Sequence, residues 1–86
     1  MARLVKLEPR DIGDDKYRNL GRLKTRQQTE LYSLIVERSK RGLWTTYEDA
    51  QKIGIICPDK RMTDIKRACP DAVQVQRVGR RVEFCV

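Results

Sequence analysis

Apolar side chains recur every three or four residues along residues 25–41, and this spacing is typical of an amphipathic helix. Thr25, followed three residues later by Gln28, has the signature of a capping box at the start of a helix. Gly42 follows the pattern directly, and glycine readily takes the left-handed conformation that ends many helices. The sequence therefore predicts a first helix over residues 25–41.

A short strand and a shorter helix are expected next. Residues 43–45 are rich in strand-forming side chains and too few for a helix. Thr45 with Glu48 makes another capping-box signature, and Thr46 is a competing cap. A second helix is therefore predicted over residues 47–53, where a glycine follows. The apolar residues that this helix is expected to bury are Ala50 and Ile53.

A third helix is predicted to begin at Pro58, because proline suits the first helical position, where its missing N–H is not needed. The helix should end before Pro70, because the residue preceding a proline avoids the helical region. Successive residues are about 100° apart around a helix. The face expected to be buried then carries Pro58, Met62, Ile65 and Cys69. The opposite face carries Lys60, Thr63, Asp64 and Arg67.

The last residues alternate between apolar and polar side chains in the manner of two paired strands. Residues 79–80, Gly-Arg, form a two-residue turn between them. The resulting register places Val75 opposite Phe84 on the buried face. It places Gln76 opposite Glu83 on the face toward solvent. The sequence thus predicts a C-terminal β-hairpin.

Residues 1–24 follow no such pattern, because a proline, two glycines and charges of both signs interrupt every period. Their only candidate elements are a short strand over residues 4–7 and a short helix over residues 14–20. We therefore expect a basic, partly ordered N-terminal arm over residues 1–24, followed by a folded domain over residues 25–86.

Composition narrows the classes of function. The 86 residues, 40% hydrophobic and 36% charged, are typical of one small globular domain. No histidine occurs, which removes the usual general base and the commonest metal ligand. The three cysteines, Cys57, Cys69 and Cys85, are too widely spaced for a zinc site, so we expect reduced thiols, two of them acting as small hydrophobic residues. No targeting or membrane-spanning stretch is visible. These features predict a non-catalytic, cytoplasmic protein with no metal, cofactor or membrane partner.

Charge points to a polyanionic partner. The chain has 19 lysines and arginines against 12 acidic residues, a formal charge of +7. Residues 1–24 and 55–86 each carry 7 basic and 4 acidic residues, whereas residues 25–54 carry 5 and 4. This uneven distribution is expected where one face meets a nucleic acid.

The order of helix, short strand, short helix, tight turn, helix and hairpin resembles a winged helix-turn-helix domain over residues 25–86. The resemblance implies an α+β fold, mainly α, with three helices and a C-terminal β-hairpin wing. It also implies double-stranded DNA as the partner, with the third helix in the major groove. Winged-helix repressors often dimerise through a second long helix after the wing. None follows here, so the oligomeric state stays open.

Three sets of residues would contact DNA by this resemblance. The recognition helix would contribute Lys60, Arg61, Thr63, Asp64 and Arg67. The wing would contribute Arg77, Arg80 and Arg81. The start of the second helix would hold a phosphate at free N–H groups near Thr46 and Tyr47.

Each set has a structural alternative. Asp64 either accepts a hydrogen bond from a cytosine or pairs with Lys60 one turn away. The wing arginines either bind phosphate or form a solvated turn that resists aggregation. Trp44 is expected in the core beneath the hairpin and Tyr32 at the core margin, so base stacking by aromatic residues is poorly supported.

Other functions remain open at this point. An enzyme could hold Mg²⁺ at Asp11, Asp14 and Asp15, but no convergent acid, base or nucleophile set accompanies them. A protein-interaction adaptor would instead use the exposed Val78 and apolar residues of the arm. Structured RNA suits a helix-plus-wing layout less well than B-form DNA does. Size and layout are typical of small transcriptional regulators and replication or recombination accessory factors, including those of phages and mobile elements.

Overall fold

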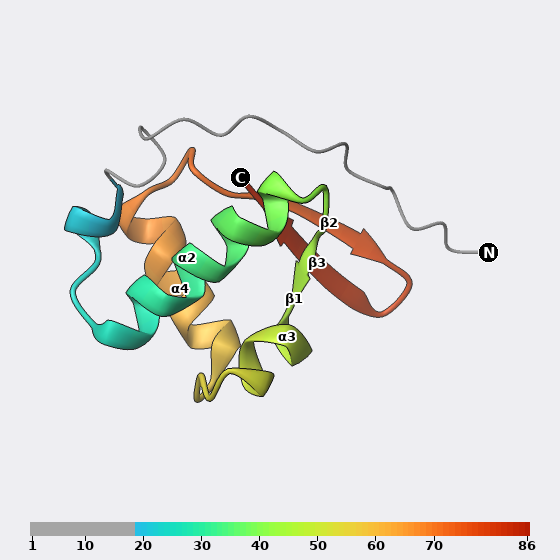
Figure 1. Ribbon diagram of the computed structural model, residues 1–86, viewed down its shortest axis with the longest axis horizontal. Coiled ribbons are helices and arrows are strands. Elements are labelled where there is room, and N and C mark those ends of the chain that lie inside the picture. The colour runs from blue at the N-terminus through green and yellow to red at the C-terminus, as the bar shows by residue number, and fades with distance from the viewer. Residues whose placement is uncertain (1–18) are drawn as a thin grey trace.

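The computed structural model describes residues 19–86 (Figure 1). In chain order the elements are η1 (Asn19–Arg22), α2 (Arg26–Lys40), β1 (Thr45–Thr46), α3 (Tyr47–Lys52), α4 (Pro58–Ala68), β2 (Gln74–Val78) and β3 (Arg81–Cys85). They form a small α+β fold that is mainly helical, with three α-helices and a three-stranded antiparallel sheet. The strand expected over residues 4–7, most of the helix expected over residues 14–20, and Asp11, Asp14 and Asp15 lie outside the described residues.

Helix α2 confirms the first predicted helix and both of its ends. Thr25 is the N-cap, and its side chain accepts a hydrogen bond from the Gln28 N–H at 3.2 Å. The Gln28 side chain accepts from the Lys24 N–H at 2.9 Å rather than from the Thr25 N–H. In a capping box the Gln28 side chain would accept from the N–H of the cap residue, Thr25. Here it accepts from the N–H of the residue before the cap. Gly42 takes the left-handed conformation expected of it, with φ 77°.

Helix α3 begins at Tyr47, as predicted, and the structure decides between its two candidate caps. Thr45 is not its cap, because this residue pairs with Phe84 in the sheet and its side chain is fully buried. Thr46 caps the helix instead and forms a capping box with Asp49. Ile53, expected in the core, is 47% exposed. Ile53 is the C-cap of the helix, where the chain turns away from the core. Ile55, two residues later, is buried instead.

Helix α4 confirms the third predicted helix in its start, its end and its buried face. It begins at Pro58 and stops two residues before Pro70. The four side chains of the expected buried face, Pro58, Met62, Ile65 and Cys69, are all buried. Within residues 19–86 two cysteines are buried, as expected, and Cys57 is exposed.

The terminal hairpin forms with the predicted turn and register. Val75 pairs with Phe84 and Gln76 with Glu83, and the sheet order is β1-β3-β2. The exposure of the two faces differs from the prediction. Glu83 is only 4% exposed because β3 is the central strand, and its carboxylate accepts a 2.7 Å hydrogen bond from Gln76 Nε2. Val75 is 40% exposed because β2 lies at the edge of the sheet.

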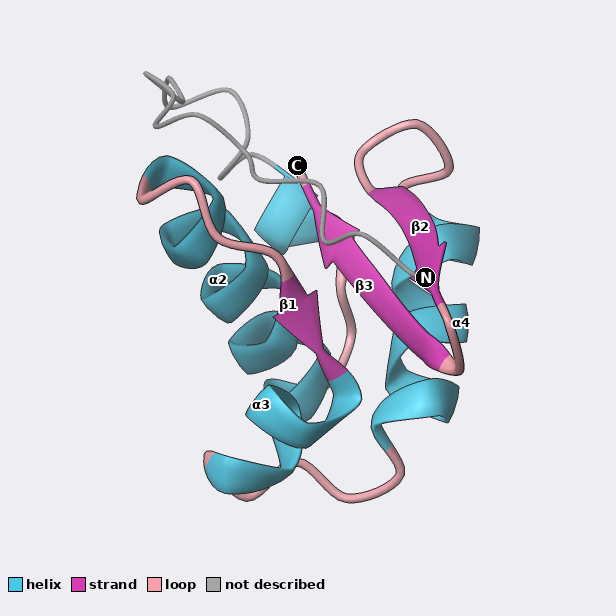
Figure 2. Cartoon of the chain, turned by 90° about the vertical axis from the view of Figure 1, so that its right-hand side faces the viewer, coloured by secondary structure: helices cyan, strands magenta, loops and turns pink. Residues whose placement is uncertain are grey.

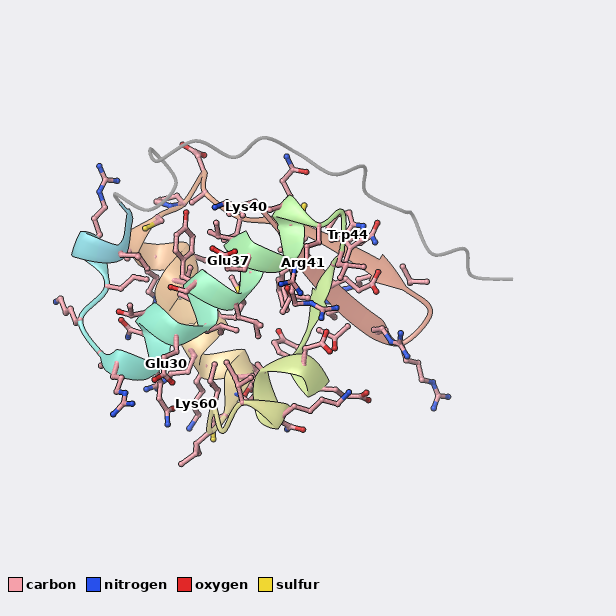
Figure 3. All side chains as sticks on the ribbon, viewed as in Figure 1. Glu30, Glu37, Lys40, Arg41, Trp44 and Lys60 are labelled. Carbon is pink, nitrogen blue, oxygen red and sulfur yellow. The ribbon has the colours of Figure 1, made fainter. Side chains whose placement is uncertain are left out.

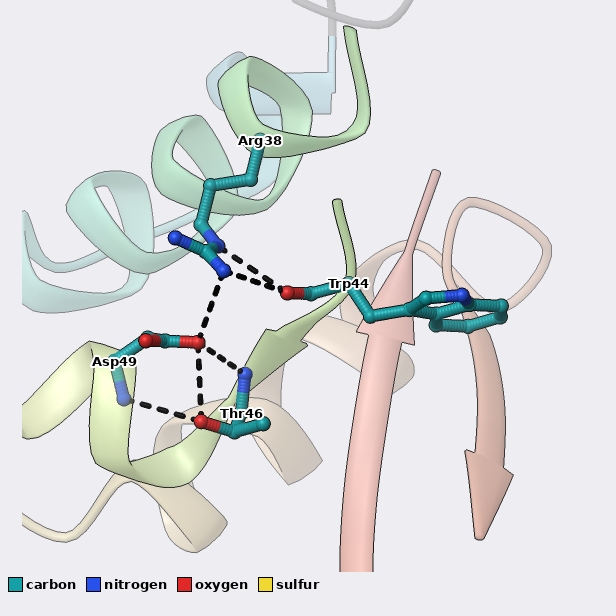
Figure 4. A network of polar contacts seen from close by, with 4 residues as sticks. All are labelled: Arg38, Trp44, Thr46 and Asp49. Atoms are coloured by element: carbon teal, nitrogen blue, oxygen red, sulfur yellow. Dashed lines mark hydrogen bonds and ion pairs between the residues drawn. The ribbon is translucent and has the colours of Figure 1, made fainter. Parts of the chain in front are cut away.

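The core lies where α2, α4 and the inner face of the sheet meet (Figures 1 and 2). Tyr32, expected at its margin, is fully buried within it. Trp44, expected in the core, is only half-buried, and its indole extends across the β3–β2 side of the sheet (Figure 4). Leu23 also joins the core, so the described fold extends before residue 25. Among residues 19–86, no helix has the length and apolarity needed to cross a membrane.

Candidate nucleic-acid interface

The outer face of α4 presents basic side chains because the opposite face is anchored in the core. Pro58, Met62 and Ile65 are buried, which turns Lys60, Thr63 and Arg67 into solvent. Lys60 projects away from the body of the molecule (Figure 3). Lys66 is exposed as well; it was not among the predicted contacts, although its place in the last turn could have suggested it. No acidic residue in the described part of the chain forms an ion pair with Lys60, Lys66 or Arg67.

Asp64 and Arg61 lie on the same helix but are engaged with protein partners. Asp64 Oδ2 accepts a hydrogen bond from Gln28 Nε2 of α2 at 3.0 Å. The same oxygen lies 3.5 Å from Arg61 Nη2. Both side chains are about one-third exposed, at 34% and 29%. Asp64 therefore ties α4 to α2, and its ion pair is with Arg61 instead of the Lys60 that helical spacing also allows.

The hairpin turn carries the second group of cations. Arg77, Arg80 and Arg81 are all exposed, around a turn in which Gly79 has φ 62°. A positive φ suits glycine. The two-residue turn places Arg80 at the tip of the hairpin, and Arg81 follows as the first residue of β3. Within residues 19–86 these three arginines also have no acidic partner.

The start of α3 is closed by its own side chains. Asp49 Oδ2 accepts hydrogen bonds from the Thr46 N–H and the Thr46 hydroxyl, both at 3.0 Å, and Thr46 Oγ1 accepts from the Asp49 N–H (Figure 4). The Thr46 N–H is therefore not free to hold a phosphate, which corrects that part of the expectation. A carboxylate at this position also repels an anion.

Arg38 completes this cluster from α2. Its guanidinium donates to the Trp44 carbonyl oxygen from Nε at 3.2 Å and from Nη2 at 2.9 Å. Nη2 also lies 3.4 Å from Asp49 Oδ2. The cluster thus joins the end of α2, strand β1 and the start of α3 (Figure 4). Its role is to set the position of α3 beside the sheet.

Tyr47, the first residue of α3, is half-buried against the sheet. Its ring packs on Phe84 with centroids 5.1 Å apart. Burial raises the pKa of its hydroxyl, the Asp59 carboxylate adds to the rise, and the Arg77 charge opposes it. The ring contact places the Tyr47 side chain against β3, and we interpret it as a packing residue.

Two open grooves border these cations. The first, of about 600 Å³, lies between the start of α3 and the hairpin and is lined by Thr46, Tyr47, Glu48, Val78, Arg80, Arg81 and Val82. Predicted residues from two separate sets therefore meet at one groove. Val78, expected to be exposed, is half-buried in its wall. The second groove, of about 570 Å³, lies beside α4 and is lined by Arg22, Lys24, Gln28, Asp64, Arg67 and Ala68.

The second groove contains cations that the prediction assigned to the N-terminal arm. Arg22 and Lys24 flank Leu23 in sequence, and that buried leucine was the signal that could have placed them in the folded domain. No protein-family model, curated protein or solved structure matched the chain.

Proposed function

We propose that this protein is a small winged-helix protein that binds double-stranded DNA without catalysis. Its elements follow the order helix, strand, helix, helix, strand, strand, with a sheet order of β1-β3-β2. This arrangement puts a β-hairpin and a solvent-facing helix on one domain, and a helix is the element that most DNA-binding motifs place in the major groove. A cytoplasmic regulator, or an accessory factor in replication or recombination, is the role that fits a domain of this size.

The observation that carries the proposal is the set of exposed cations that have no acidic partner within residues 19–86. Along the longest axis of the molecule α3 lies between α4 and the hairpin turn, and both of those elements present such cations (Figure 1). A lysine or arginine that contacts a phosphate releases condensed counterions, and this release favours binding. We assign Lys60, Thr63 and Arg67 to the major groove and Arg77, Arg80 and Arg81 to the backbone.

Helical spacing alone makes Asp64 a candidate for base reading, but its carboxylate is already bonded within the protein. Base reading would require its carboxylate to exchange the Gln28 amide for a cytosine amino group. We therefore propose that Asp64 mainly sets the orientation of α4. Lys60 is left as the basic side chain best placed to read bases.

A salt titration with labelled duplex DNA tests the proposal. Replacing Arg80 and Arg81 by alanine should weaken binding to all sequences roughly five- to tenfold at low salt. The slope of log affinity against log salt should become shallower by about 0.9 for each lost phosphate contact. Lys60→Ala should instead change the preference among sequences.

A charge-matched control comes from the C-terminal end of α2. Lys40→Ala with Arg41→Ala also removes two positive charges. Lys40 lies at the opposite edge of the view from Lys60 (Figure 3). This control should bind DNA like the parent protein. Equal losses in the control and the Arg80/Arg81 variant would mean that only net charge matters. A parent protein that binds no duplex at low salt would refute DNA binding and favour the adaptor hypothesis.

A further inference from the structure

The second groove is cationic although it contains a carboxylate. Its charged lining consists of three cations, Arg22, Lys24 and Arg67, and one acid, Asp64. The acid accepts a hydrogen bond from Gln28 Nε2 and lies 3.5 Å from the Arg61 guanidinium, which is not part of the groove lining, so Arg61 offsets part of its charge. No acidic residue within residues 19–86 forms an ion pair with any of the three cations.

The fold holds these cations in place. Leu23 is only 9% exposed, while the residues on either side of it face solvent. The main chain at Lys24 is pinned by the hydrogen bond from its N–H to Gln28 Oε1. Arg22 lines the groove together with Ala68, the last residue of α4, so its side chain lies beside the end of that helix. Gln28 thereby connects the first turn of α2, the Lys24 main chain and Asp64.

We infer that this groove binds a backbone phosphate of the nucleic acid, so that the interface reaches past α4 as far as η1. The inference rests on the proposed function and extends it to a contact absent from the expected sites. Arg22, Lys24 and Arg67 line the same open groove, and guanidinium and ammonium groups donate the charge-assisted hydrogen bonds that a phosphate accepts. Arg67 lies on the outer face of α4 and also lines the groove, so the groove continues that face.

The dimensions of the molecule give this inference a measurable consequence. Helix η1 and the hairpin turn lie near opposite ends of the longest axis, which measures 39 Å (Figure 1). B-form DNA rises about 3.4 Å per base pair, so contact with both ends requires about 11 base pairs. A duplex of about 8 base pairs is too short to reach both.

The test measures affinity for hairpin-closed duplexes of about 8 and about 12 base pairs at several salt concentrations. The parent protein should bind the longer duplex roughly five- to tenfold more tightly, beyond the small gain in the number of binding positions. Arg22→Ala with Lys24→Ala should reduce this length-dependent gain to less than about twofold, and its salt slope on the longer duplex should fall by about 0.9, the value for one lost phosphate contact. The Lys40/Arg41 variant is the charge-matched control and should keep the gain. Arg22→Gln with Lys24→Gln serves if the alanine variant does not fold by circular dichroism.

The outcomes separate the two proposals. If the parent protein binds no duplex, both fail. If Arg80 and Arg81 matter but the Arg22/Lys24 variant keeps the length-dependent gain, only the groove assignment is overturned. A lower melting temperature with unchanged affinity would overturn it as well, because the cations would then only stabilise the C-terminal end of α4. Inorganic phosphate that competes as well as an equal concentration of duplex phosphate would mean a small-anion site instead of a backbone contact.

Discussion

The protein uses arginine in two contrasting ways. Arg38 is half-buried, donates twice to the Trp44 carbonyl oxygen and contacts Asp49. Arg80 and Arg81 are exposed and have no acidic partner within residues 19–86. A guanidinium whose donors are satisfied within the protein stabilises the fold, whereas one whose donors point to solvent adds little to stability and has donors that a ligand can accept. Mutation of Arg38 should therefore lower stability and leave DNA affinity nearly unchanged, whereas mutation of Arg80 and Arg81 should lower DNA affinity and leave stability nearly unchanged.

Arg38→Ala should have the largest effect on stability. It removes two hydrogen bonds and an ion pair from a half-buried cluster, so the free energy of unfolding should fall by about 2 kcal/mol. For a domain of this size the melting temperature should fall by roughly 10 °C. DNA affinity of the folded variant should stay within about twofold of the parent value, as an effect of overall charge alone would allow.

Arg38→Lys is the informative control for this change. It keeps the positive charge but cannot reproduce the planar two-donor contact with the Trp44 carbonyl oxygen. Most of the stability loss should therefore remain. Full recovery with lysine would mean that charge, and not geometry, stabilises the cluster. A selective loss of DNA binding in Arg38→Ala would break the contrast between the two regions.

Thr46→Ala tests the same cluster from the start of α3. The change removes the N-cap side chain and should lower the free energy of unfolding by about 1 kcal/mol. Thr46→Ser keeps the capping oxygen and should recover most of the loss. Chemical denaturation of both variants measures the difference. Equal stability of the alanine variant and the parent protein would show that the capping box contributes little.

Thr45→Val should have a smaller effect, of opposite sign. The Thr45 side chain is fully buried, and its hydroxyl has no hydrogen-bond partner in the described residues. Replacing an unsatisfied buried hydroxyl by a methyl group of similar size should raise the free energy of unfolding by up to about 1 kcal/mol. A capping role for Thr45, one of the two candidates in the sequence, would predict destabilisation instead. Denaturation of this variant beside Thr46→Ala therefore distinguishes the two assignments.

The smallest effect concerns Tyr47 at alkaline pH. Burial, together with the Asp59 carboxylate, raises the pKa of its hydroxyl above the ordinary 10.0. The folded state thus favours the neutral hydroxyl, and this contribution to stability is complete below pH 10.0 and is lost as pH rises through the raised pKa. The stability difference between the parent protein and Tyr47→Phe should therefore shift against the parent between about pH 8 and about pH 11. A difference independent of pH would contradict this interpretation.

Much of the fold could be predicted because it depends on local chemistry. Thr25, Gly42 and Pro58 mark helix ends through their own backbone and capping preferences, and each does so in the structure. The hairpin register follows from a two-residue turn and from alternation along the strands, and the Val75–Phe84 pair confirms it. These features require no knowledge of what packs on them.

The errors occur where exposure depends on distant segments. Glu83 and Val75 both lie in the predicted hairpin, but pairing with β1 covers the first, and the edge position of β2 leaves the second half exposed. Asp64 faces away from the buried side of α4, yet Gln28, which is 36 residues away in sequence, reaches its carboxylate. Periodicity assigns a side chain to a face of its element, but it does not show what lies opposite that face.

The amino-acid sequence was sufficient to predict where α2 and α4 begin and end, how the terminal strands pair and that the chain is strongly basic. Capping, turn geometry and charge are properties of neighbouring residues, so they can be read without a fold. Only the tertiary structure decided which threonine caps α3, which arginines are satisfied and that Arg22 and Lys24 join Arg67 around one groove. Those outcomes depend on side chains far apart in sequence competing for the same hydrogen bonds and the same buried space.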